Sequence, residues 1–262
     1  MEKIYAEERY RKIMNIARAN NTIDVIRLSE LFGVTGATIR LDLRELESRN
    51  LIKRTHGGAI LNDANDADFK TVRDPSYISR IQQNTVFKQA IGNAVAELIN
   101  EDDIIMLDDG STTLQVAKKL PTSKKITVIT NGLNICLELS KHTNIDVIAT
   151  GGILNKSDLS YNGRFAEEIT CKFNANKAIL GASGITIKNG ITSPDEMKAG
   201  LKKAMIQNSS ELIIVADHTK LTRISLIPIC TLEKVNTLIT DSQAPVEIVE
   251  IIRGLGVKVI LA

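Results

Sequence analysis

TIRLDLRELESRN, residues 38–50, is the stretch of this sequence that decides how its N-terminal part folds. Ile39, Leu43 and Leu46 recur at the i, i+4 and i+7 spacing that places apolar side chains on one face of a helix. Thr35 stands where an N-cap residue is needed, because its hydroxyl can accept a bond from the first turn. The stretch therefore predicts an amphipathic helix with a buried face and an outward face.

The outward face of this predicted helix carries small and basic residues around one exposed leucine. A helix that follows a shorter helix and a tight turn has the geometry that enters the major groove of DNA. Small residues permit close approach, arginine can bond to guanine edges or phosphates, and leucine can contact a thymine methyl group. The candidate DNA-contacting residues here are Thr35, Gly36, Ala37, Thr38, Arg40, Leu41 and Arg44. Alternatively, Leu41 packs against a neighbouring subunit or is an isolated exposed leucine.

Further elements surround this helix on both sides. Residues 7–20 and 28–32 carry apolar side chains at helical spacing, and the second pattern ends at a glycine. LIKRTHGGAI, residues 51–60, predicts a short basic strand and a Gly-Gly turn, typical of a hairpin or wing. Its candidate phosphate-contacting residues are Lys53, Arg54, His56 and Gly57. Taken alone, a basic strand is more often a solvated sheet edge.

The charge balance adds a weak argument for a polyanionic partner. Residues 1–60 hold 11 Lys and Arg against 8 Asp and Glu, whereas residues 61–262 hold 22 against 23. The basic surplus is therefore N-terminal, although so small a surplus also fits a solvated surface.

Composition excludes several classes of protein. With 262 residues, of which 43% are hydrophobic and 24% charged, the chain can bury the cores of two modest domains. No apolar run approaches the ~20 residues that cross a bilayer, and the N-terminus lacks a secretory signal, so we expect a cytoplasmic protein with no membrane partner. The three cysteines, Cys136, Cys171 and Cys230, are too far apart for a zinc knuckle. We expect no metal and no cofactor.

A different pattern follows residues 61–82, which are polar and typical of a linker. Short apolar runs alternate with helical segments at DIIML (103–107), ITVIT (126–130), DVIAT (146–150), KAILG (177–181), ELIIVA (211–216), TLIT (237–240) and VKVIL (257–261). Such alternation predicts a largely parallel sheet with helices on both faces, which binds ligands at the carboxyl ends of its strands. We therefore expect a winged helix-turn-helix at 1–60, a linker at 61–82 and an α/β domain at 83–262.

Polar residues gather where these predicted strands end. LDDGSTTL, residues 107–114, leads from a strand into a helix, so the backbone N–H groups after Gly110 can hold an anion. The loop lacks the Walker spacing, and taken alone it equally fits a capped strand-to-helix turn. Other strand ends carry TNG at 130–132, TGG at 150–152 and DHTK at 217–220. Hydroxyl, amide, carboxylate and lysine groups around one nest fit a phosphorylated polyol better than an apolar ligand.

Both parts of the chain resemble the DeoR family of bacterial transcriptional regulators. The family's winged helix-turn-helix pattern is matched by Val34, Thr35, Thr38, Ile39, Arg40, Asp42, Leu43, Leu46 and the His-Gly-Gly at 56–58. The α/β part is similar to the family's C-terminal sensor domain, which is related in fold to ribose-5-phosphate isomerase. Its loop motif stands at 108–112, its other strand-end motifs stand at 130–132, 150–152 and 217–220, and its lysine stands at Lys202.

The resemblance implies a regulator of a carbohydrate-use operon. Its expected partners are operator DNA, a phosphorylated sugar or sugar-alcohol effector, and further copies of the chain in a homo-oligomer, either a dimer or a tetramer. Effector binding to the sensor is expected to release the DNA, which makes the protein a repressor; activation is the alternative, because the sign of the coupling depends on the geometry between subunits. The implied effector-binding residues are Asp108, Gly110, Ser111, Thr112, Thr113, Asn131, Gly151, Gly152, Lys202 and Lys220.

The sequence departs from the family pattern at four positions. Leu41 stands where relatives typically have a second arginine, so the operator sequence is expected to differ. Lys198 replaces a glutamate, Asn155 an arginine and Arg164 a proline. Because Lys198 inverts a charge near the expected pocket and Asn155 removes a cation, the identity of the effector is left open.

The alternative is isomerase-like enzyme activity in the C-terminal domain. Deprotonation next to a carbonyl requires a carboxylate base and groups that hold the enediolate, and Asp108, Asp109 and Lys220 are candidates. A DNA-binding head is unneeded on an isomerase, and the family's sensors bind without turnover. We therefore expect no enzyme and no catalytic residues.

Overall fold

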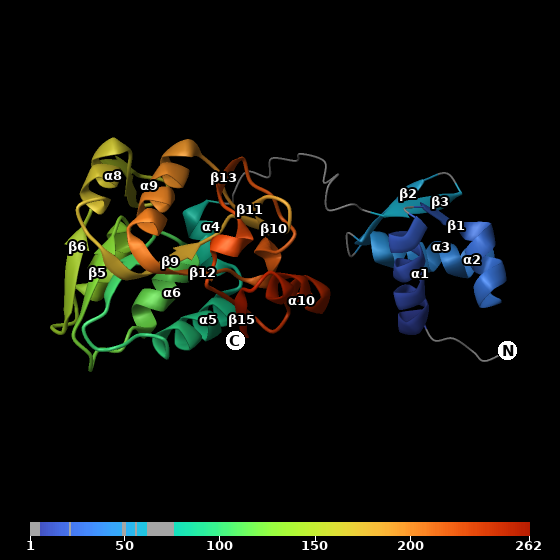
Figure 1. Cartoon of the computed structure of the whole chain (residues 1–262), viewed down its shortest axis with the longest axis horizontal. Helices are drawn as coiled ribbons and strands as arrows, with labels where there is room; N and C mark the ends of the chain where they lie inside the picture. Colours follow the sequence, from blue (N-terminus) through green and yellow to red (C-terminus); the bar gives the residue numbers. More distant parts are fainter. Residues whose placement is uncertain (1–5, 21, 49–50, 56, 62–75) are drawn as a thin grey trace. The chain divides into compact units, whose positions relative to one another are not determined.

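The computed structural model describes residues 6–20, 22–48, 51–55, 57–61 and 76–262. The chain forms two compact units, residues 1–70 and residues 71–262, which are called the N-terminal unit and the C-terminal unit below. Each unit is described by itself (Figure 1).

The N-terminal unit contains three helices and three short strands. In chain order they are α1 (Ala6–Asn20), β1 (Thr22–Asp24), α2 (Val25–Phe32), α3 (Gly36–Ser48), β2 (Ile52–Thr55) and β3 (Gly58–Leu61). The strands pair antiparallel in the order β1-β3-β2. Ile13, Leu28, Ile39, Leu43 and Leu46 are fully buried together, so the predicted three-helix core with a wing is confirmed. The short strand β1 had no clear sequence signal.

Local capping explains where these helices begin and end. The side chain of Asp24 accepts a hydrogen bond from the backbone N–H of Arg27 and starts α2. Gly33 ends α2 at a φ of 62°, a left-handed conformation that favours glycine. The hydroxyl of Thr35 accepts from the backbone N–H of Thr38 at 3.2 Å, which is the predicted N-cap of α3.

The C-terminal unit is built on a seven-stranded parallel sheet. Its order is β15-β14-β12-β9-β4-β5-β6, from strands β4 (Ile104–Leu107), β5 (Ile126–Thr130), β6 (Ile145–Ala149), β9 (Ala175–Gly181), β12 (Ser209–Val215), β14 (Thr237–Thr240) and β15 (Lys258–Leu261). All seven correspond to the apolar runs in the sequence. The predicted α/β fold is confirmed.

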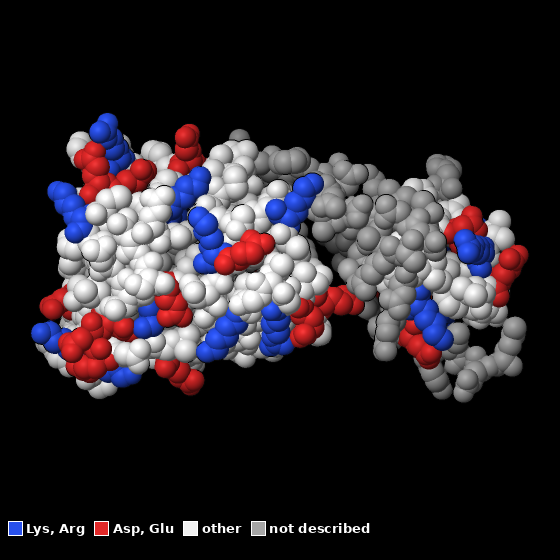
Figure 2. All heavy atoms as spheres, in the orientation of Figure 1, with Lys and Arg blue, Asp and Glu red and all other residues white. Residues whose placement is uncertain are grey.

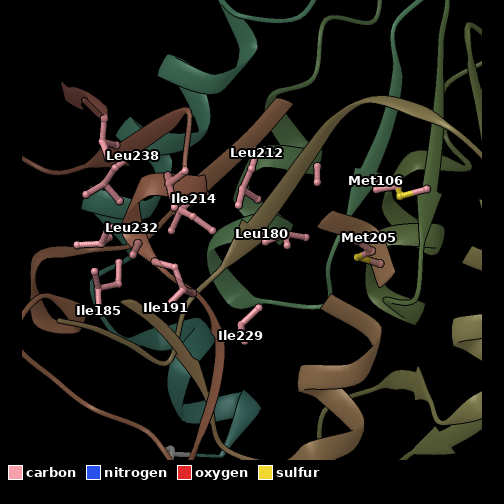
Figure 3. Close-up of a cluster of buried hydrophobic side chains, with 14 of the residues drawn as sticks. Met106, Leu180, Ile185, Ile191, Met205, Leu212, Ile214, Ile229, Leu232 and Leu238 are labelled. Carbon is pink, nitrogen blue, oxygen red and sulfur yellow. The ribbon is translucent and has the colours of Figure 1, made fainter. Parts of the chain in front are cut away.

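Helices cover both faces of this sheet. One face packs against α5 (Thr85–Ala96), α6 (Ser111–Lys119) and α7 (Leu133–Leu139), and the other against α8 (Arg164–Thr170), α9 (Glu196–Gln207) and α10 (Val246–Gly254). Successive residues of β4 alternate between the two cores: Ile105 and Leu107 face the first and Met106 the second. Figure 3 shows the second core, where Leu180, Ile214 and Met205 converge from β9, β12 and α9.

Smaller elements were missing from the sequence prediction. A three-stranded antiparallel sheet contains β10 (Gly184–Thr186), β11 (Gly190–Ser193) and β13 (Ile227–Cys230), and β7 (Ile153–Asn155) pairs with β8 (Ser160–Asn162) in a hairpin. Two short 3-10 helices are η1 (His218–Lys220) and η2 (Leu232–Lys234). These strands are only three or four residues long, which is too short for a clear alternation.

One helix lies inside the segment expected to be a linker. Residues 77–82 form α4 (Tyr77–Gln82), which begins at a Ser76 cap and buries the Tyr77 side chain. The polar composition of residues 61–82 hid this helix, because a single buried aromatic ring gives no periodic signal. None of the helices in the described ranges combines the length and the apolar character needed to span a lipid bilayer.

Candidate functional site

The outward face of α3 presents the side chains that the sequence predicted there. Leu41 is 60% exposed, and Ala37, Arg40 and Arg44 are also exposed, while Gly36 is half-buried at the start of the helix. They sit opposite the buried side chains of the same helix. Two arginines around an exposed leucine form a surface suited to phosphates, base edges and a thymine methyl group.

A buried ion pair holds α3 against α1. Arg9 donates to Asp42 in a bidentate arrangement, from Nε to Oδ2 at 2.6 Å and from Nη2 to Oδ1 at 2.8 Å. Both side chains are almost fully buried. Asp42 directly follows Leu41, so this pair fixes the rotation of α3 and with it the direction of the outward face. Arg9 was missed by sequence reasoning, since a charged residue in an amphipathic helix is usually solvated.

The wing is the hairpin of β2 and β3. Lys53 and Arg54 lie in β2, and Gly57 in the turn is exposed with a φ of 95°. Arg54 is exposed but already engaged: its backbone N–H donates to Glu47 Oε1 at 3.0 Å and its Nε lies 3.4 Å from Glu47 Oε2. His56 and the side chain of Lys53 lie outside the described residues.

The C-terminal unit has a cleft at the carboxyl ends of β4, β9 and β12. It holds about 670 Å³ of empty space, part of it open to solvent. The structure brings six of the predicted effector-binding residues to its walls: Asp108, Gly110, Ser111, Thr112, Lys202 and Lys220. The cleft therefore lies where ligands bind in open parallel sheets.

The first turn of α6 forms one wall of the cleft. Gly110 is the N-cap of α6 and places no capping side chain over the helix end. Thr113 does not line the cleft, because its hydroxyl donates to the carbonyls of Asp108 and Gly110 at 2.8 and 2.9 Å. Thr113 thus bonds within its own loop, and the N-terminal end of α6 remains open to the cleft. The helix dipole favours an anion at that end.

Three other predicted residues also lie away from the cleft. Asn131 donates to the carbonyl of Tyr161 at 3.0 Å and lies 3.4 Å from Asp109 Oδ1, so it supports the loop beside the cleft. Gly151 and Gly152 form the turn from β6 to β7, with φ values of 62° and 116°. These residues end strands that lie nearer the sheet edge than β4.

Asp108 and Lys202 form the floor of the cleft. Asp108 Oδ2 accepts from the backbone N–H of Gly181 at 2.8 Å and from Lys202 Nζ at 2.5 Å, and Oδ1 accepts from the N–H of Gly110 at 3.2 Å. Lys202 also donates to the Gly181 carbonyl at 2.5 Å. Both carboxylate oxygens are thus engaged in holding two strand ends together.

Cations outnumber carboxylates among the described residues that line the cleft. The cations are Arg80, Lys88, Lys198, Lys202 and Lys220, and the carboxylates are Asp108, Asp109 and Asp217. On the face that Figure 2 shows, by contrast, basic and acidic side chains of the C-terminal unit are interspersed. The lining of the cleft therefore carries a surplus of positive charge that suits an anionic ligand.

Lys88 connects the cleft to α4. Its Nζ donates to the carbonyls of Arg80 and Gln83, at 2.5 and 2.8 Å, at the end of α4. Burial lowers the pKa of Lys88 to about 8, although Asp217 opposes the shift. Next to it, Asn84 Nδ2 donates to Asp217 Oδ1 at 3.2 Å.

Lys198 also lines the cleft, from the first turn of α9. Its Nζ is 2.7 Å from Asp158 Oδ2 and 3.6 Å from Asp109 Oδ2. Burial alone would lower the pKa of Lys198, but the two carboxylates raise it above its ordinary value. Burial alone would raise the pKa of Asp109, but Lys198 and Lys202 hold it below its ordinary value. Both groups therefore stay charged.

Sequence reasoning missed the contribution of α4 and α5 to the cleft. Arg80, Gln83, Asn84 and Lys88 come from a segment assigned to the linker and from the helix that follows it. Asp217 was noticed only as part of a strand-end motif, and Asp109 only in its loop motif and as a candidate group for the alternative isomerase activity. The sequence offered one signal for this part of the cleft: these four polar residues fall within nine positions of the chain.

Comparison with known families now gives two matches. Residues 9–65 match the model of the DeoR-like helix-turn-helix domain, and residues 83–242 match that of the DeoR C terminal sensor domain. The two matches together span both units.

Individual proteins are similar over nearly their whole length. The transcriptional repressor AccR of Agrobacterium fabrum is 36% identical over 237 residues, which is 90% of each chain. The glycerol-3-phosphate regulon repressor of Escherichia coli is 29% identical over 245 residues, 94% of each chain. Among solved structures, ribose 5 phosphate isomerase A from Neisseria gonorrhoeae aligns with 53% of each chain at 18% identity and a TM-score of 0.38.

Proposed function

Because this chain belongs to the DeoR family of transcriptional regulators, we propose that it represses a carbohydrate-use operon and is released from DNA by a phosphorylated sugar or sugar alcohol. As a member of the family it is a DNA-binding regulator and not an enzyme. The observation that carries the effector assignment is the surplus of cations in a cleft that opens at the N-terminus of α6.

Operator binding uses the outward face of α3 and the wing. Arg40 and Arg44 contact base edges or phosphates, Leu41 contacts a thymine methyl group, and the wing follows the phosphate backbone. Two N-terminal units are needed for a two-fold operator, so the active species is a homo-oligomer, a dimer or a tetramer.

The effector's phosphate binds in the cleft. The backbone N–H groups of the first turn of α6 and the side chains of Lys202 and Lys220 surround the phosphate, and the hydroxyl groups of the polyol contact the polar walls. The name of the Escherichia coli relative, which regulates a glycerol-3-phosphate regulon, supports a phosphorylated polyol as the ligand class. Lys198 adds a further cation to the lining of the cleft, which favours those phosphorylated compounds that place negative charge near it.

Effector and operator then compete through two arrangements of the oligomer. An effector that binds more tightly to the arrangement that misplaces the N-terminal units weakens DNA binding by the same factor. Typical couplings are about 5- to 150-fold.

The proposal is tested by fluorescence anisotropy with the DNA upstream of the protein's own gene. Titrations are made at one fixed salt concentration, because phosphate contacts make affinity steeply salt-dependent. Specific binding that is released by one member of a panel of phosphorylated sugars and sugar alcohols is the expected result. Specific binding that no phosphorylated compound releases contradicts the effector assignment, and the absence of specific binding contradicts the operator assignment.

A further inference from the structure

Asp158 holds two of the cations that line the cleft. Its Oδ1 lies 2.8 Å from Arg80 Nη2, and its Oδ2 lies 2.7 Å from Lys198 Nζ. All three side chains are at least five-sixths buried. A carboxylate that takes one bond from a guanidinium and one from an ammonium group has the same partners that a phosphate oxyanion would use.

Asp158 itself is not part of the cleft wall. It lies in the turn of the β7–β8 hairpin, a two-stranded element outside the main sheet, and the next residue, Leu159, has a left-handed φ of 52°. Asn155 at the end of β7 donates to Asp158 Oδ2 at 3.2 Å. The carboxylate thus reaches the cleft cations from the turn of a short hairpin outside the main sheet.

Unused polar atoms among the described residues that line the cleft indicate room for another partner. Arg80 Nε is buried and has no hydrogen-bond partner. Ser193, which lines the cleft and is only 1% exposed, has a hydroxyl that is also buried without a partner. Buried donors without partners are costly, so their place in a ligand cleft points to a ligand that satisfies them.

Two departures from the family pattern meet at this carboxylate. Asn155 and Lys198, two of the positions at which the sequence differs from the expected family pattern, both contact Asp158. Its Oδ2 thus accepts from a residue of its own hairpin and from the first turn of α9.

We propose that Asp158 is an internal competitor of the effector: it occupies Arg80 and Lys198 in the free protein, and the effector's phosphate, bound beside them at the first turn of α6, displaces it. The inference rests on the proposed function and deepens it. Asp109 lies 3.6 Å from Lys198 and stays in place, so the exchange replaces one carboxylate with one phosphate at the same two cations.

The displacement has a consequence for α4. Arg80 is the α4 side chain that pairs with Asp158, and α4 is the first helix of the C-terminal unit in the described part of the chain. When the phosphate takes Arg80, α4 loses its tie to the β7–β8 hairpin and gains one to the ligand. The bound effector is thereby coupled to the start of the C-terminal unit.

The test compares the full-length protein with Asp158→Asn, which keeps the shape and removes the charge. The probe is inorganic phosphate, and binding is followed by the rise in melting temperature at constant ionic strength maintained with chloride. If the carboxylate occupies the two cations about nine-tenths of the time, the variant binds phosphate about tenfold more tightly. Phosphate affinity that is unchanged or weaker in Asp158→Asn overturns the proposal.

Two further variants test whether a change in phosphate affinity comes from Asp158 itself and not from altered folding or net charge. Asn155→Ala removes one hydrogen bond to Asp158 without touching either cation, and we expect it to tighten phosphate binding by about two- to threefold. Glu168→Gln removes a carboxylate from an exposed pair with Arg164 and is expected to leave affinity unchanged. An equal gain in Glu168→Gln would show that net charge is responsible and would contradict the competition.

The outcomes separate the inference from the proposed function. Phosphate binding by the wild-type protein that is equally strong in Asp158→Asn refutes the competition and leaves the effector cleft in place. No phosphate binding by either protein contradicts both. Operator binding by Asp158→Asn that needs less of a phosphorylated effector for release is the expected companion result.

Discussion

The two cationic regions of this protein hold their charges in opposite ways. On α3, Arg40 and Arg44 project into solvent from one helix, beside an exposed leucine. In the cleft, Lys88 on α5 and Lys198 and Lys202 on α9 are buried and are held by carboxylates or carbonyls. Binding to exposed cations weakens as the salt concentration rises. Buried cations with fixed partners instead select a ligand by its charge and shape.

The largest expected effect is a loss of stability when the buried ion pair behind the exposed face of α3 is broken. Asp42→Asn leaves Arg9 buried without its bidentate partner, and we expect the N-terminal unit to lose about 3–5 kcal/mol of unfolding free energy. Chemical denaturation followed by circular dichroism measures the loss. The matched control is Glu8→Gln, which removes an exposed pair with Lys12 and should cost less than about 0.5 kcal/mol. Equal losses in the two variants would show that the buried pair is not what holds α3.

The next effect separates the two regions by function. Arg40→Ala is expected to weaken operator binding by about 10- to 100-fold and to leave effector binding unchanged. Anisotropy titrations over a series of salt concentrations also show whether the salt slope falls by about one. If operator affinity stays at the wild-type value, the outward face of α3 is not the DNA-binding face.

The reverse experiment removes a cation from the cleft. Lys220→Ala is expected to weaken effector binding by about tenfold, because it removes a charge-assisted hydrogen bond, and to leave operator affinity unchanged. Calorimetric titration with the compound that releases the operator gives the affinity. A variant that still responds at wild-type effector concentrations would remove Lys220 from the phosphate site.

The smallest expected effect uses pH. The pKa of Lys88 is about 8, so its ammonium loses its proton as pH rises from 7 to 9. A phosphate monoester stays dianionic over that range, since its second pKa is about 6. Effector affinity is therefore expected to fall with rising pH, by at most about tenfold, and Lys88→Gln is expected to bind weakly with a flat profile. A wild-type profile as flat as that of the variant would show that the charge of Lys88 does not contribute to effector binding.

The same contrast explains what the sequence could predict. The α3 face depends on residues within one helix, so the spacing of Ile39, Leu43 and Leu46 was sufficient to orient Arg40 and Leu41. The strand-end motifs placed Asp108 and Ser111 at the cleft because parallel strands end at one edge of a sheet. Arg80 and the Asp158 contact depend on a short helix and a short hairpin that only tertiary packing brings together, and no local pattern records that packing.

The engagement of Asp108 has one more consequence. Because the N–H groups of Gly181 and Gly110 and the ammonium group of Lys202 bond to its two oxygens, this carboxylate fixes the end of β9 and the start of α6 at the floor of the cleft. Under the proposed function, a ligand binds there and is released without turnover, so its occupancy is expected to follow its concentration at equilibrium. Such a protein acts as a gauge of supply that consumes nothing of what it measures.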